Sequence, residues 1–195
     1  MSEASPDVPT LLTARLRLRR LAEDDAPGLH ECFGDPVAMR FWDAPASPDL
    51  AETERRIRQS VSADTIWHAA WAVLARGDDG FLGMVNYHAR QPWNRRLALG
   101  WILARRHWGA GLMHEAVVAV VVHCFETLDT HRIEAEIEPD NHRSLRLAER
   151  LGFAREALLR DRMFVAGEPR SVQMHALFRP DWRAAPGGHG PVRRD

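Results

Sequence analysis

Apolar and polar residues alternate along several short stretches, a pattern typical of strands with one buried face. Residues 14–19 alternate Ala or Leu with Arg, and residues 132–138 place isoleucines and an alanine opposite glutamates. The run at 97–103 is apolar on both faces, which predicts a central strand. Four further strands are predicted at residues 68–74, 81–88, 154–162 and 172–178.

Helical spacing predicts four helices: residues 22–34, 47–61, 112–128 and one that begins after Asn141. The valines within 117–122 favour a strand by propensity, but the length of the run and the glycines before it favour a helix. Asn141 is a suitable N-cap for the fourth helix, and Gly152 suits its C-terminal end. Strands and helices together predict an α+β class.

The 195 residues are enough for one domain with a substantial core. Residues 1–12 are expected to form a loose leader, 13–182 the domain, and 183–195, rich in Gly, Pro and Arg, a disordered tail. The leader lacks the apolar segment of a secretory signal, and no apolar run approaches the length of a membrane span. A cytoplasmic protein without a membrane partner is therefore expected.

A net charge of −1 predicts no whole-molecule attraction to nucleic acid. The two cysteines, Cys32 and Cys124, form neither a metal motif nor a disulfide framework. The pair His114–Glu115 begins like a zinc-protease motif, but Val118 stands where the second histidine is needed. No metal is expected.

Two glycines, Gly109 and Gly111, lie between the predicted central strand and the helix at 112–128. Glycines let backbone N–H groups converge, and a helix N-terminus carries partial positive charge, so phosphate oxygens could bind here. A simple turn is the alternative. A P-loop is excluded because Leu112–Met113 follow where Lys and Ser or Thr are required.

The segment 106–111, Arg-His-Trp-Gly-Ala-Gly, resembles the coenzyme A loop of the GCN5-related N-acetyltransferases. That motif is Gln or Arg, two residues, Gly, one residue, and Gly or Ala. The surrounding sequence resembles the RimJ/RimL-like branch, which acetylates ribosomal-protein N-termini. The shared features are Trp108–Gly109, Glu115–Ala116, His131–Ala135, Asn141 with Ser144, and Leu151–Phe153. The resemblance implies a mixed, mostly antiparallel sheet of about seven strands with about four helices, splayed beside the central strand.

The resemblance also implies that acetyl-CoA is the co-substrate. The backbone of Ile102, Leu103 and Ala104 would pair with pantetheine and hold the acetyl carbonyl. Asn141 would touch the coenzyme, and Ser144 would give a proton to the leaving sulfur, although a helix cap and an inert exposed serine are the alternatives. The pyrophosphate would bind the loop and the helix start, at Arg106, His107, Trp108, Gly109, Ala110, Gly111, Leu112 and Met113.

Two catalytic groups common in that family have no counterpart here. Ala98 stands where a general-base glutamate is usual, and the only tyrosine, Tyr87, lies on an earlier strand than the usual tyrosine acid. Ser144 is then the candidate acid and His88 the candidate base, with His68 as the second choice. Direct attack of an amine on the thioester is expected, because neither cysteine has a recognisable nucleophile setting.

The predicted function is acetyl transfer from acetyl-CoA to a primary amine, with a protein or peptide N-terminal α-amine as the acceptor. A small-molecule amine, such as an antibiotic or polyamine, and a non-catalytic acyl-CoA-binding module are the alternatives. The sequence leaves open the acceptor, the acyl chain and the oligomeric state, a homodimer being one possibility.

Overall fold

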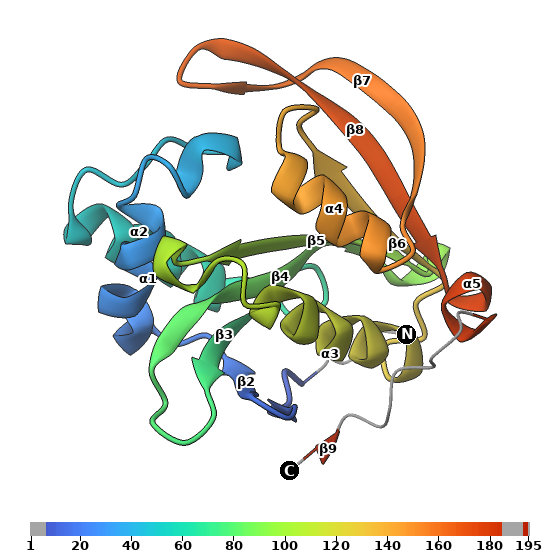
Figure 1. Ribbon diagram of the computed structural model, residues 1–195, viewed down its shortest axis with the longest axis horizontal. Coiled ribbons are helices and arrows are strands. Elements are labelled where there is room, and N and C mark those ends of the chain that lie inside the picture. The colour runs from blue at the N-terminus through green and yellow to red at the C-terminus, as the bar shows by residue number, and fades with distance from the viewer. Residues whose placement is uncertain (1–6, 185–192, 195) are drawn as a thin grey trace.

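The computed structural model describes residues 7–184 and 193–194. One sheet has the strand order β7-β8-β6-β5-β4-β3-β2-β1-β9 (Figure 1), and β5 with β6 is its one parallel pair in the described chain. The predicted α+β fold with a mixed, mostly antiparallel sheet is confirmed. The strands are β1 Leu11–Leu12, β2 Leu16–Arg20, β3 Ala69–Ala75, β4 Phe81–Gln91, β5 Arg96–Leu103, β6 Arg132–Ile137, β7 Ala154–Val165, β8 Glu168–Phe178 and β9 Arg193–Arg194.

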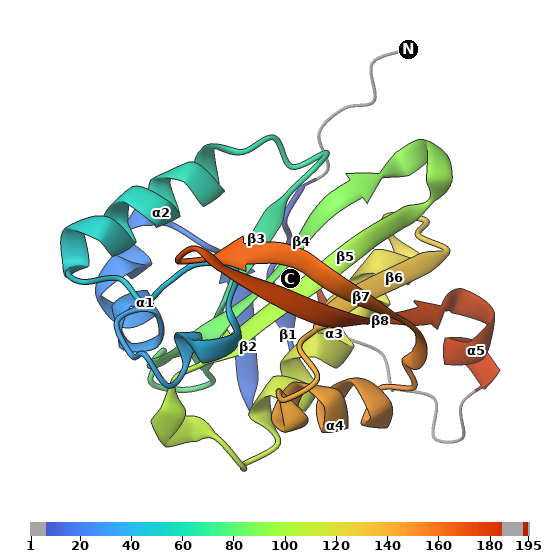
Figure 2. The same ribbon diagram turned by 90° about the horizontal axis from the view of Figure 1, so that it is seen from above.

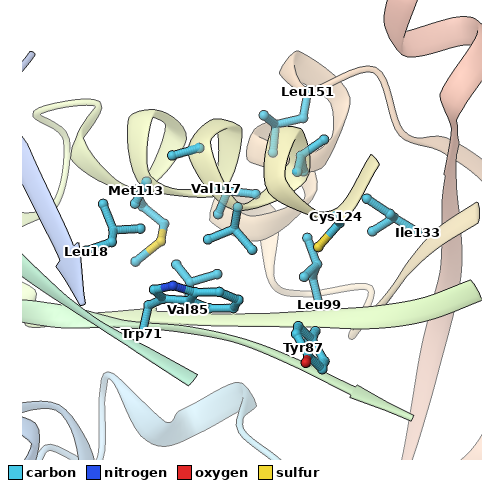
Figure 3. Close-up of a cluster of buried hydrophobic side chains, with 14 of the residues drawn as sticks. Leu18, Trp71, Val85, Tyr87, Leu99, Met113, Val117, Cys124, Ile133 and Leu151 are labelled. Carbon is cyan, nitrogen blue, oxygen red and sulfur yellow. The ribbon is translucent and has the colours of Figure 1, made fainter. Parts of the chain in front are cut away.

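Helices cover both faces of the sheet. In the main core, Met113, Val117 and Cys124 of α3 face Trp71 and other side chains of the central strands (Figure 3), and α4 packs into the same core. A second core places α1 and α2 on the opposite face. Among the described residues, no helix is long and apolar enough to cross a membrane. The α-helices are α1 Ala26–Phe33, α2 Leu50–Ser62, α3 Leu112–Glu126, α4 His142–Arg150 and α5 Arg179–Ala184.

The valine-rich segment of α3 is helical despite its strand propensity. Val117, Val120 and Val121 are fully buried, as are the neighbouring Ala116 and Ala119. Burying one such side chain is worth about 1.5–3 kcal/mol, which exceeds the helix-propensity penalty of a β-branched residue.

Two helices begin later than predicted. Before α1, Glu23–Asp25 form a 3₁₀ turn in which the Asp25 carboxylate accepts the Ala22 N–H at 2.9 Å, so the α-helix starts only at Ala26. The start of α2 is set by Asp49, whose side chain caps the first turn. The Asp49 carboxylate caps α2 directly, whereas the Asp25 carboxylate stabilises the 3₁₀ turn that precedes α1.

The chain ends differ in part from the predictions. Leu11–Leu12, within the predicted leader, form β1, and Leu11 is fully buried. Of the predicted tail, residues 185–192 and 195 lie outside the described residues, while Arg193–Arg194 pair with β1 as β9. These two short strands bring the sheet above the predicted seven.

The pairing between β5 and β6 is short. It joins Arg96–Ala98 to Arg132–Glu134, yet β5 continues to Leu103. Beyond Ala98, no further pairing with β6 occurs in the described part of the chain. The predicted splay beside the central strand is therefore present.

The hairpin of β7 and β8 is longer than predicted, although its turn lies at Ala166–Gly167 as expected. Most residues of β7 are exposed, so alternation of apolar and polar positions gives little signal along it. Figures 1 and 2 both show the tip of this hairpin close to the blue loop that precedes α2.

Candidate active site

The glycine loop ends in left-handed backbone at the start of α3. Gly109 has φ 85° and Gly111, the N-cap of α3, has φ 75°. A Cβ at Gly109 would meet no described atom within 4 Å. The amides of Leu112 and Met113 precede the first bond of the helix, from Glu115 N–H to the Gly111 carbonyl at 3.2 Å. Free N–H groups at a helix start are the usual place where proteins bind anions such as phosphate.

The basic residues before the glycines are tied to the first helix. Arg105 and Arg106 lie in the 3₁₀ turn η4 (Arg105–His107). The Arg105 guanidinium is 2.9 Å from an Asp35 carboxylate oxygen, and Arg106 forms an ion pair with Glu31. Both guanidinium groups already have carboxylate partners on or beside α1. The backbone N–H groups of the loop are therefore better candidates for binding an anion than its arginine side chains.

Glu115 fastens the loop to the segment before β2. Its carboxylate accepts hydrogen bonds from Thr13 Oγ1 at 2.5 Å, Arg15 N–H at 2.8 Å and Arg15 Nε at 2.7 Å. Arg15 Nη1 also donates to the Ala110 carbonyl at 3.0 Å. Burial raises the pKa of Glu115, but these hydrogen bonds outweigh it, and the net pKa is lowered. Sequence reasoning placed Glu115 at the helix start but missed Arg15.

Two indole rings link β5 to α4. Trp101 Nε1 donates to Ser144 Oγ at 3.2 Å, and Trp108 Nε1 donates to the Leu103 carbonyl at 2.8 Å. The Arg143 guanidinium carbon lies 4.3 Å from the centre of the Trp108 ring. These contacts bring the start of α4 beside the splayed part of the central strand.

Asn141 caps α4, the simpler of its two predicted roles. Its Oδ1 accepts the Ser144 N–H at 3.2 Å, which fixes the first turn. Ser144 Oγ accepts from Trp101, so the hydroxyl proton remains available to another acceptor. The hydrogen bond from Trp101 joins residues 43 apart in sequence, so no local pattern could predict it.

Successive residues of β5 point their backbone N–H and C=O groups to opposite sides of the strand. The Ala104 N–H donates to the Leu82 carbonyl on the β4 side at 2.8 Å. Alternate residues of an antiparallel strand face the same partner, so Ile102, which pairs with Met84, also faces β4. Leu103 and Trp101 then face the splay. Of the three predicted backbone positions, Leu103 alone has this orientation, which it shares with Trp101.

His88 lies on the face of the sheet opposite α4. Although His88 is an exposed residue, loss of hydration lowers its pKa more than the charges of Asp43 and Glu136 raise it, so the net pKa is lowered. Burial, with the charge of His88, lowers the pKa of His68 to about 4, and its Nε2 lies 2.8 Å from Ser60 Oγ. Both imidazoles are therefore neutral near pH 7 and able to accept a proton.

A family model described as the acetyltransferase (GNAT) domain matches residues 15–154. The chain belongs to this family. It is thus an acetyltransferase, of a family that uses acetyl-CoA, and the predicted family is confirmed.

Relatives of this GNAT acetyltransferase support the assignment. The uncharacterized N-acetyltransferase p20 of Bacillus licheniformis is 29% identical over 174 residues, covering 89% of this chain and 98% of p20. The ribosomal protein uS5-alanine N-acetyltransferase of Escherichia coli is 38% identical over 84 residues, 43% of each chain. The structure of RimL, a ribosomal L7/L12 α-N-protein acetyltransferase, in complex with coenzyme A has a TM-score of 0.77 at 20% identity, covering 88% of this chain and 97% of that one. This last likeness shows the fold.

The cysteines and Trp93 of this GNAT chain lie away from the glycine loop. Cys32 and Cys124 are fully buried, and burial raises the pKa of Cys32 to about 12 and that of Cys124 further. Trp93 is exposed and its ring contacts that of Trp67. It precedes the start of β5, whereas the glycine loop follows the end of that strand. No group of three His, Cys, Asp or Glu in the described ranges is arranged to hold a metal ion.

Proposed function

We propose that this acetyltransferase transfers an acetyl group from acetyl-CoA to a primary amine, and that the preferred amine is the N-terminal α-amino group of a protein or peptide. One observation carries the proposal. The glycine loop, the splayed edge of β5 and Ser144 adjoin one another, while the neutral His88 lies on the other face. The named activity of the uS5-alanine relative supports the α-amine.

Each part of the coenzyme has a chemical match. The amides of Gly111, Leu112 and Met113, with the positive end of α3, suit the pyrophosphate. The backbone of Trp101 and Leu103 along the splayed edge suits the pantetheine amides, and a β5 N–H would hold the acetyl oxygen. Among the predicted contacts, Ile102 and Ala104 would then act through packing.

The residues act on opposite sides of the thioester. The amine lone pair forms a C–N bond to the carbonyl carbon, and collapse of the tetrahedral adduct breaks the C–S bond. The amine proton leaves through His88 to water. The departing sulfur takes a proton from Ser144, which regains one from water. Holding both reactants in line supplies much of the acceleration.

We call the face of the sheet that carries His88, opposite Ser144, the acceptor face. Its charges favour an acceptor with one amine. Glu134 and Glu136 share this face, but Arg96 lies 2.9 Å from the former and Arg162 2.9 Å from the latter. Asp43, whose charge acts on His88, is a single further carboxylate and has no ion pair among the described residues. A polyamine site would need a surplus of unpaired carboxylates, so the α-amine is the better match.

An acceptor screen with acetyl-CoA and detection of free thiol tests the proposal. Peptides that begin with Ala or Ser should release thiol faster than polyamines or aminoglycoside-type amines. Acetyl-CoA binding without thiol release with any amine would instead indicate a non-catalytic module. Cytoplasmic residence and a homodimer remain predictions, to be checked by fractionation and light scattering.

A further inference from the structure

Asn86 carries a side-chain amide oxygen that no residue in the described ranges satisfies. It lies in β4 and is 8% exposed. Its Oδ1 is buried without a hydrogen-bond partner in the described chain. A buried polar group without a partner is unfavourable for folding unless water or a ligand satisfies it.

Gly100 provides the space for this amide. Asn86 and Gly100 are paired across β4 and β5. A Cβ on Gly100 would lie 2.5 Å from Asn86 Oδ1 and 3.8 Å from Trp42 Cη2. The amide therefore lies over the glycine, and the Trp42 ring adjoins the same spot. Any side chain at position 100 would displace it.

The amide lies next to the place where the sheet opens. Gly100 belongs to the part of β5 beyond Ala98, where pairing with β6 has ended. Residues Asn86 and His88 are two apart on one strand, so both side chains lie on the same face. That is the acceptor face, opposite the face that carries Ser144. An amine bound on this face, beside the open part of β5, would lie near the amide.

We propose that Asn86 binds the acceptor amine and orients its lone pair, a role that rests on the proposed acyl transfer. The Oδ1 atom accepts one N–H of the neutral amine, which directs the lone pair toward the thioester. A neutral amide suits this task better than a carboxylate, because a carboxylate would stabilise the ammonium form, which cannot attack. The same contact discriminates against acceptors that lack a free N–H.

The test is Asn86→Leu, which keeps the approximate shape and removes the polar atoms. With a peptide that begins with Ala or Ser, kcat/KM for the peptide should fall about tenfold or more. The Kd for acetyl-CoA, measured by calorimetry, should stay within about twofold, which is about 0.4 kcal/mol. The melting temperature should be unchanged or higher, because an unpaired buried group has been removed. A merely structural asparagine would show the reverse, lower stability with unchanged kinetics.

A double-mutant cycle gives a second measurement that does not depend on Leu fitting. Gly100→Ala should lower kcat/KM for the peptide by displacing the amide, but should add little to Asn86→Ala, where no amide remains to be displaced. Ser47→Ala is the matched control, since Ser47 is also buried with an unpartnered oxygen, and its kinetics should equal wild type.

Additive effects in the cycle, or wild-type kcat/KM in Asn86→Leu, would overturn the assignment of Asn86 while leaving the proposed function intact. If the wild-type enzyme turns over no amine, the proposed function fails, and the role of Asn86 fails with it.

Discussion

The serine at the start of α4 shows how neighbours give one residue a role. Ser144 receives a hydrogen bond from Trp101, which leaves its own proton free. Ser144→Ala should lower kcat by about 10², the low end for a general acid, because a thiol of pKa about 8.5 is already a fair leaving group. Trp101→Phe, which keeps the ring and removes the N–H, should show a smaller loss of kcat.

Steady-state kinetics and calorimetry check this prediction together. Acetyl-CoA affinity should change little in Ser144→Ala. An equal fall in affinity would show that Ser144 binds the coenzyme without assisting the departure of sulfur.

His68 makes folding stability depend on pH. Burial, with the charge of His88, lowers its pKa from 6.5 to about 4. Between these values the unfolded chain binds more protons than the folded one, so this contribution to stability is lost as pH falls. From pH 7.5 to 5 it amounts to about 1–2 kcal/mol. In urea unfolding, His68→Gln should flatten this decline, whereas the exposed control His142→Gln should retain it; equal slopes in all three proteins would contradict the assignment.

At the scale of elements, the glycine loop depends on backbone conformation more than on space. Gly111→Val places a β-branched residue at φ 75°, where such side chains are strained, although its Cβ would have only Arg15 Nη2 nearby, at 3.7 Å. The loop amides would shift, and calorimetry should show about tenfold weaker coenzyme A binding, or 1.4 kcal/mol.

Gly77→Val is the matched control for that substitution. Gly77 also has positive φ, 117°, and no described atom within 4 Å of its Cβ position, but it lies in the turn between β3 and β4. The Gly77→Val substitution should lower the melting temperature and leave coenzyme A affinity unchanged. Wild-type affinity in a folded Gly111→Val variant would remove the loop from the binding site.

Elements with a clear apolar period were predictable from sequence, and those without one were not. The clean alternation at 132–138 corresponds to β6, and the apolar run at 97–103 to β5. The two-residue β1 is too short to show a period, and the exposed β7 has few buried positions to report one. The helix start at Asp49 required the cap geometry.

At the scale of the whole molecule, the sheet separates the residues proposed to act on the leaving sulfur from those proposed to act on the amine. Ser144 lies on the α3 and α4 face, while Asn86 and His88 lie on the face of α1 and α2. The sequence motif predicted the loop and Ser144, because their residues are local. It could not predict Asn86, since the reason for its unpaired amide is a glycine on the neighbouring strand.

The absence of a glutamate at Ala98 is the basis for the proposed preference for α-amines. An α-amino group has a pKa of about 7.7–8.0 and a lysine side chain about 10.4. At pH 7.5 roughly a quarter to two-fifths of α-amines are neutral, against about one in a thousand lysines. That difference is about 3.5 kcal/mol of deprotonation, and His88, with its lowered pKa, is a weak base for supplying it.

The most direct measurement compares two peptides at pH 7.5 with acetyl-CoA. One has a free N-terminus and no lysine, and the other has a blocked N-terminus and one lysine. The account predicts faster thiol release and N-terminal acetylation with the first peptide. Faster turnover of the blocked lysine peptide would contradict it.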